Sequence, residues 1–192
     1  MHKNYVLLSI ITLTTFLAGC AGKAIAQSNQ VTPTSVPVQV ELTTTPEVVS
    51  REPPPSCLVT VPQVPPFVPP APYDALGYEG YFWFGSNSLW TSLPHDAVWA
   101  DLPDNPGGYT QKVFWWRDGY IWNEEPEPNL IVTGERLDAS APPLIASKAT
   151  NAYAGDIGSA MLAGVDFPTL GCWKITGKYE DAELSFVVWV AP

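Results

Sequence analysis

The C-terminal end of the chain carries the feature that most limits its fold, two runs of β-forming residues joined by a short turn signal. The runs are Cys172–Tyr179 and Glu183–Val190, and Glu180-Asp181-Ala182 separates them. Runs this rich in Val, Ile, Phe, Tyr and Trp, bounded by polar residues, predict an antiparallel hairpin. Alternation places apolar side chains on both faces of the second run, which predicts an interior strand rather than an edge strand.

The same signal recurs through residues 57–192, which hold all eight tryptophans. Short runs of β-branched and aromatic residues alternate with Gly, Pro, Asn and Asp, and no apolar stripe of helical period is sustained. About eight strands with turns between them predict an all-β fold, an immunoglobulin-like β-sandwich. Besides the terminal hairpin, the expected strands are Gly80–Phe84, Ser88–Ser92, Lys112–Arg117, Asn129–Leu137, Leu144–Lys148 and Ile157–Leu162.

Residues 21–72 have a different composition, dominated by Thr, Ser, Val, Gln and Pro. Such a segment buries too little apolar surface to offset its ordering entropy, and its prolines favour extended conformations. We therefore expect residues 20–56 to form a disordered tether. At about 3.1 Å per residue it would hold a domain up to roughly 110 Å from its attachment point.

The first residues have the layout of a secretory signal peptide: His2 and Lys3, an apolar run from Tyr5 to Leu17, and small residues before Cys20. The run is too short to span a bilayer comfortably. Leu17-Ala18-Gly19-Cys20 resembles the lipobox of bacterial lipoproteins, where a peptidase cuts before a lipid-modified cysteine. The alternatives are an ordinary cleaved signal and a short buried helix.

The lipobox resemblance, together with the change in composition, predicts three segments: a signal peptide at 1–19, a lipidated Cys20 with the tether at 20–56, and a domain at 57–192. It also implies an extracytoplasmic protein anchored to a bacterial membrane by acyl chains on Cys20. Two or more chains give a firm anchor, because each buried CH₂ contributes about 0.8 kcal/mol.

Only Cys57 and Cys172 remain once Cys20 is assigned to lipid. An exported domain matures where disulfides persist, so the even pair predicts a Cys57–Cys172 bond. The alternative is two unpaired buried thiols.

Several motifs also resemble a set of exported bacterial proteins of unknown function, over most of residues 57–190. The resemblance implies a compact extracytoplasmic domain and no particular activity. The motifs are Ser56-Cys57-Leu58-Val59-Thr60, Ser88-Leu89-Trp90-Thr91, Trp115-Trp116-Arg117, Gly134-Glu135-Arg136-Leu137-Asp138 with Ala141-Pro142-Pro143, and Phe167-Pro168 through Gly171-Cys172-Trp173-Lys174-Ile175-Thr176-Gly177.

Catalytic groups are sparse in residues 57–192. Histidine is the usual base of an acyl-transfer triad, and His95 is the only one outside the signal segment, in a turn-like Leu93-Pro94-His95-Asp96. With both thiols assigned to a disulfide, neither a cysteine nucleophile nor a zinc site is expected. The sequence therefore predicts no catalytic residues, no metal and no cofactor. An envelope hydrolase that uses acidic residues is the alternative of a different class.

Acidic residues give the chain a formal net charge of −10, which argues against binding nucleic acid. Two groups of oxygen-bearing side chains could supply calcium ligands, but neither has the ligand spacing of a known calcium loop. They are Asn123-Glu124-Glu125-Pro126-Glu127-Pro128-Asn129, and Asp101 with Asp104 and Asn105.

Aromatic residues are the candidates for binding. In Lys112–Arg117, alternation puts Trp115 and Trp116 on opposite faces of the strand, so one large ring is a candidate for exposure. Exposed rings stack on sugars or anchor a partner protein; the competing interpretation is that they fill the core. The candidate residues are Trp83, Trp90, Trp115 and Trp116.

Together these patterns predict a lipid-anchored envelope lipoprotein with a non-catalytic β-sandwich that serves as a binding or protein-interaction module, whose expected partner is an envelope protein or a glycan. Binding of carbohydrate or cell wall through exposed aromatics is the alternative.

Overall fold

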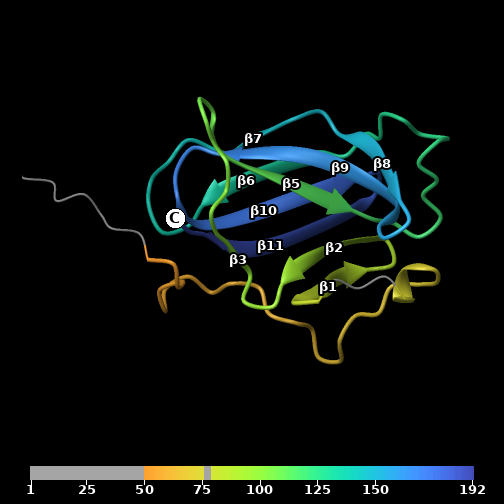
Figure 1. The fold of residues 1–192 in the computed structure, drawn as a ribbon, viewed down its shortest axis with the longest axis horizontal. Helices are drawn as coiled ribbons and strands as arrows, with labels where there is room; N and C mark the ends of the chain where they lie inside the picture. The colour runs from red at the N-terminus through yellow and green to blue at the C-terminus, as the bar shows by residue number, and fades with distance from the viewer. Residues whose placement is uncertain (1–49, 76–78) are drawn as a thin grey trace, which may run out of the picture. The chain divides into compact units, whose positions relative to one another are not determined.

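The computed structural model of the chain describes residues 50–75 and 79–192 (Figure 1). Within these ranges the fold is all-β, with one short 3₁₀ turn, η1, at Tyr73–Ala75 and no α-helix. The predicted all-β class is confirmed. In the described part of the chain, no helix is long and apolar enough to cross a membrane.

Eleven strands occur in the described ranges, and they form three sheets. The strands are β1 (Tyr81–Ser86), β2 (Leu89–Pro94), β3 (Val98–Trp99), β4 (Asp104–Asn105), β5 (Gly108–Trp115), β6 (Ile131–Arg136), β7 (Ile145–Ala146), β8 (Thr150–Ala154), β9 (Gly158–Phe167), β10 (Gly171–Tyr179) and β11 (Ala182–Val190).

The four-stranded sheet has the order β3-β11-β10-β6. β10 and β11 form the predicted hairpin, with Gly171 opposite Val190 and Tyr179 opposite Ala182. The turn is one residue shorter than predicted, because Ala182 already pairs and only Glu180 and Asp181 lie between the strands. β11 lies between β10 and β3, so the predicted interior position of the last strand is confirmed.

The five-stranded sheet has the order β4-β5-β9-β7, and β8 also pairs with β9. β9 is its longest strand and continues to Phe167, five residues beyond the predicted end at Leu162. β8, β3 and β4 were not predicted from the sequence. β8 lacks β-branched aliphatic residues, and the other two are too short to show a period.

One apolar core fills the space between these two sheets. The five-stranded sheet contributes Val113 and Trp115, and the four-stranded sheet contributes Trp173, Ile175 and Phe186, all almost completely buried. Two sheets that share one core define a β-sandwich.

A second, smaller core covers the outer face of β5 and β9. Trp116 and Ala160 from that face pack with Trp90 of β2 and with Tyr73, which lies in the segment preceding β1. β1 and β2 form a separate two-stranded sheet next to the end of β5 (Figure 1). The C-terminal end of β5 is therefore covered on both faces.

The segment before β1 is hydrogen-bonded to the backbone edge of β11. Thr60 N donates to Val187 O at 2.9 Å, and Val187 N donates to Thr60 Oγ1 at 2.8 Å. Further upstream, the indole Nε1 of Trp189 donates to Ser50 O at 2.8 Å. Within the described residues, contacts with the domain therefore extend back to Ser50, seven residues before the predicted domain start at residue 57.

Candidate functional site

The two cysteines assigned to a disulfide lie at bonding distance. Cys57 and Cys172 have Cα atoms 5.7 Å apart, inside the range that a disulfide requires, and are 115 residues apart in sequence. Both are nearly fully buried, together with Trp189 and Ala191. Cys20 and most of the predicted tether lie outside the described residues.

Motifs far apart in sequence meet beside this bond. Asp138 accepts hydrogen bonds from Cys172 N at 3.1 Å and from Arg136 Nε at 2.7 Å. Burial alone would raise the pKa of Asp138, but these hydrogen bonds and the Arg136 charge outweigh it and hold the pKa below its usual value. The carboxylate thereby fixes the start of β10 to the end of β6.

The candidate binding aromatics do not form a surface. Trp90, Trp115 and Trp116 are completely buried, so the hypothesis that one of their rings is exposed is wrong. Trp83 is partly buried and packs edge-on against Trp116, with ring centroids 5.0 Å apart. Trp90 and Trp116 are buried because the second core covers the outer face of β5, which was expected from the sequence to be exposed.

The exposed rings are elsewhere. Trp122 and Tyr153 are 36% and 61% exposed, and their rings stack at 5.3 Å with planes 19° apart. Asn151 Nδ2 donates to Trp122 O at 2.6 Å, which ties the loop to β8. This pair was not predicted from the sequence, because Trp122 lies in an acidic loop and Tyr153 lies among small residues, and neither context indicates an aromatic cluster.

The remaining catalytic and metal candidates are dispersed. His95 stacks on Phe82, with ring centroids 5.9 Å apart. Glu127 forms an ion pair with Lys148, and Asp101 pairs with Arg51 at 2.6 Å. Across the described residues, no three His, Cys, Asp or Glu side chains gather as they would around a metal ion.

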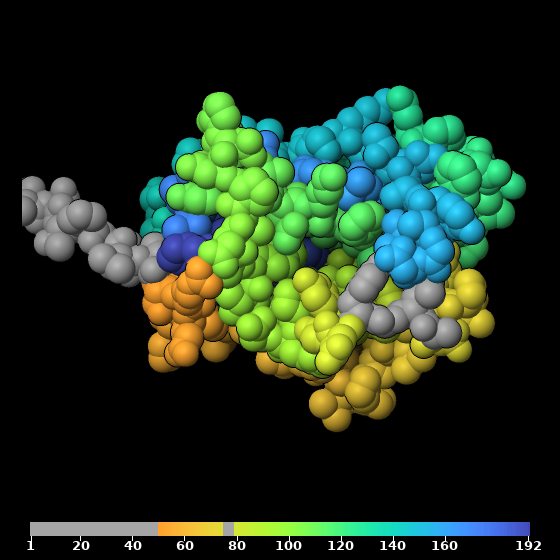
Figure 2. Space-filling model, in the orientation of Figure 1, coloured from red at the N-terminus to blue at the C-terminus, as the bar shows by residue number. Residues whose placement is uncertain are grey.

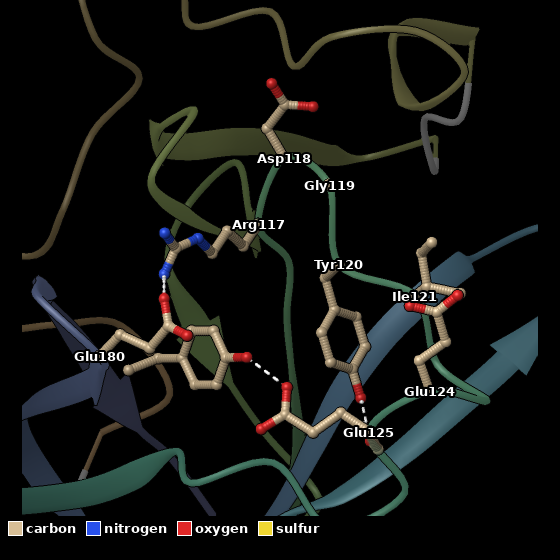
Figure 3. Close-up of a pocket in the computed structure, with 9 residues that line it drawn as sticks. Arg117, Asp118, Gly119, Tyr120, Ile121, Glu124, Glu125 and Glu180 are labelled. Carbon is tan, nitrogen blue, oxygen red and sulfur yellow. Dashed lines mark hydrogen bonds and ion pairs between the residues drawn. The ribbon is translucent and has the colours of Figure 1, made fainter.

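A polar hollow of about 330 Å³ lies between residues 117–125 and the tip of the β10–β11 hairpin. Figure 3 shows the Arg117 side chain directed toward Glu180 and the Tyr120 ring directed toward Glu125, whereas the Asp118 carboxylate points away from them. Tyr120 Oη donates to Glu125 O at 2.9 Å, the Tyr179 hydroxyl donates to the Glu125 carboxylate, and Arg117 forms an ion pair with Glu180. Its polar groups thus lock the loop onto the hairpin.

The two tyrosines of this hollow are hydrogen-bond donors that resist ionisation. Burial, followed by the nearby Glu125 charge, raises the pKa of Tyr120 to about 12. Burial, followed by the hydrogen bond to Glu125, also raises the pKa of Tyr179. Each hydroxyl therefore keeps its proton at neutral pH.

Alkaline pH is expected to destabilise the domain through Tyr120. Because its folded pKa lies above the ordinary tyrosine value of about 10, its contribution is complete below pH 10 and is lost as the pH rises to about 12. Between these pH values, unfolding free energy from urea titration should fall more steeply for the wild type than for Tyr120→Phe. Equal slopes would contradict the raised pKa.

A larger hollow, about 720 Å³, is an open groove between β2 and β5, within the size range of ligand clefts. Figure 2 shows the surface hollowed between the yellow-green residues of the β1–β2 hairpin and the green and light-blue residues opposite. Its floor and walls are Glu79, Tyr81, Ser92, Trp99, Gln111, Lys112, Val113, Phe114, Ala154, Asp156 and Ile157.

The groove combines apolar and polar surface. Val113, Trp99 and Phe114 supply apolar area, and Lys112 places a cation on an exposed position of β5. Two carboxylates, Glu79 and Asp156, come from outside β5. No sequence signal marked this groove, since it arises where two strands separate in space.

Comparison with known proteins adds no assignment: no family model, curated protein or solved structure matches the chain.

Proposed function

We propose that this chain is a lipid-anchored lipoprotein of the bacterial cell envelope, and that its β-sandwich is a non-catalytic module that binds another protein. The groove between β2 and β5 carries the proposal. It is larger than the tyrosine hollow and mixes apolar area with a few polar groups, which is the usual character of a binding site. The polar groups of the tyrosine hollow instead engage one another, which is typical of a structural role.

An immunoglobulin-like connectivity is part of this proposal. In immunoglobulin domains, strands A, B, E and D form one sheet and strands C, F and G the other. The orders β4-β5-β9-β7 and β6-β10-β11 follow the same pattern, which supports the finer classification. Such sandwiches frequently serve as interaction domains, although fold alone does not define function.

Membrane attachment through Cys20 predicts a simple fractionation result. Cys20→Ala removes the acyl acceptor, so the protein should leave the membrane fraction as a soluble or uncleaved form and should take up no labelled fatty acid. Cys57→Ser, which leaves the lipobox-like segment intact, is the matched control. Persistent fatty-acid labelling of Cys20→Ala would refute the anchor.

Site-specific photocrosslinking tests the binding role. A photoreactive amino acid at Lys112, in the groove, should give a discrete protein adduct in envelope preparations. The control position is Lys178, an exposed lysine of β10 that does not line the groove. No adduct at Lys112, or equal adducts at both positions, would argue against the groove as the binding site.

Carbohydrate binding is the second candidate, now favoured only by the exposed Trp122–Tyr153 pair. The outer ring faces of such a pair offer stacking surface for a sugar. A signal on a glycan array that Trp122→Ala abolishes would support it, and an array without signal would remove it.

A further inference from the structure

The groove lies where β2 and β5 separate after a single bridge. Trp90 N donates to Trp116 O, and Trp116 N donates to Trp90 O, both at 2.9 Å, as in an antiparallel pair. Backbone groups of successive strand residues point alternately to the two edges. The even-numbered residues therefore direct their N–H and C=O groups into the gap, namely Ser92 from β2 and Lys112 and Phe114 from β5.

Two of these backbone groups on β5 already have partners. Lys112 N donates to Gln111 Oε1 at 2.9 Å, and Phe114 O accepts from Thr91 Oγ1 at 2.8 Å. Among the described residues, Lys112 O, Phe114 N and both backbone groups of Ser92 have no hydrogen-bond partner. The groove is thus bordered by two open strand edges.

The open groups form a specific pattern. Lys112 O and Phe114 N are the acceptor and donor that one residue of a parallel neighbour engages, and the two groups of Ser92 are those that one residue of an antiparallel neighbour engages. Because β2 and β5 run antiparallel at their bridge, a strand parallel to β5 is antiparallel to β2. One inserted strand satisfies both edges.

We propose that the groove receives an extended segment of a partner protein, which inserts between β2 and β5 as a strand parallel to β5. This proposal rests on the proposed binding function and specifies how it operates. Main-chain hydrogen bonds supply affinity in such strand addition, and alternate side chains supply specificity.

The register defines which residues the segment needs. One residue lies level with Val113 and bonds to Lys112 O and Phe114 N, and its side chain points to the same side as Val113. Trp99 also lines that side of the groove, so this residue should be apolar. The next residue lies level with Phe114 and, by the continued pairing of Trp90 with Trp116, opposite Ser92.

The outer face of β5, which carries Lys112 and Phe114, determines which residues the segment needs at the positions before and after the one level with Val113. The residue level with Phe114 shares the outer face with that ring, and Ile157 also lines the groove, so it should be apolar. The residue level with Lys112 lies beside an exposed ammonium group and should be acidic. The segment is therefore an acidic residue followed by two apolar residues.

Synthetic peptides test the insertion directly. The probe is fluorescein-labelled Thr-Thr-Thr-Thr-Glu-Val-Val-Thr-Thr, titrated with the full chain in detergent micelles and followed by fluorescence polarisation. Replacing the amide of either valine by an ester removes one donor, to Lys112 O or to Ser92 O. Each ester should weaken binding about fivefold, whereas an ester at the first Thr–Thr bond should not.

A charge exchange tests the register. Lys112→Glu should weaken binding of the Glu peptide about threefold to fivefold and favour a peptide with Lys in its place by a similar factor. Lys178→Glu, which changes an exposed lysine outside the groove, should leave both affinities unchanged.

Several outcomes would overturn the proposal. Insensitivity to both valine esters, or equal binding of a reversed Val-Val-Glu peptide, would exclude the parallel strand. No peptide binding despite a protein adduct at Lys112 would keep the binding function and reject strand insertion. Glu47-Val48-Val49 of this chain has the same pattern, so self-association that Glu47→Lys abolishes would assign the groove to a second copy instead.

Discussion

Cys172→Ser is expected to lower the free energy of unfolding by about 4 kcal/mol, since a bond that closes a loop of this length restricts the unfolded chain by roughly that amount. Cys57→Ser should cost nearly as much. The double variant should be no worse than either, because all three variants lose the same bond. Urea unfolding followed by tryptophan fluorescence measures the change.

The matched control for this prediction is the wild-type domain unfolded in the presence of a thiol reductant, which should reproduce the stability of the double variant. Near-additive losses in the double variant would mean that the two side chains act separately. Two alkylatable thiols in the exported, unreduced protein would refute the bond itself.

If Cys20 anchors the chain to a membrane, as proposed, the site of this bond also affects how a pull on that anchor would reach the domain. The N-terminal segment is joined to β11 through Thr60 and Val187, and the Ser50–Trp189 hydrogen bond lies upstream of the cysteine. A force applied through the tether would therefore load the final hairpin through a covalent link. The first strands would not be peeled away.

Local patterns in the sequence predicted the elements that are long and alternate regularly. β10 and β11 were predicted almost to the residue, because each is a long run rich in β-branched and aromatic residues that ends at polar turn residues. The cysteine pair followed from counting, because the lipobox-like segment accounted for the third cysteine. Both are properties that neighbouring residues carry by themselves.

Other features depend on contacts that no local pattern encodes. Alternation correctly placed Trp115 and Trp116 on opposite faces of β5, but it could not show that Tyr73 and Trp90 cover the second face. One of the two rings was therefore expected to be exposed, although both are buried. That Trp115 and Trp116 lie on opposite faces follows from the period of two, but that both faces are covered does not.

The groove is a further example of such a feature. β2 and β5 were both predicted, with errors of a few residues at their ends, yet their separation beyond Trp90 and Trp116 depends on how the β1–β2 hairpin rests on the sandwich. The ends of strands and the separation of neighbouring strands depend on tertiary packing. The two strands that border the groove were therefore predicted from the sequence, but the groove was not.

Trp115→Ala is expected to cost about 4 kcal/mol, because the ring is completely buried between the two sheets and its removal leaves a cavity. Trp122→Ala is the matched control: Trp122 is 36% exposed, and its loss should change stability by about 0.5 kcal/mol or less. Thermal and urea unfolding of the two variants give the comparison. Similar losses would show that Trp115 does not organise the core.

The partner of the Trp115 ring in the opposite sheet makes this prediction sharper. Gly177 lies against the ring, and a Cβ at this position would overlap it. Gly177→Ala should therefore cost about 2 kcal/mol by overpacking. Trp115→Phe shortens the ring and should make room for the added methyl, so the double variant should be more stable than the sum of the two single losses predicts. Strict additivity in this double-mutant cycle would mean that the two residues are not in contact, and that the sheets are held apart by other side chains.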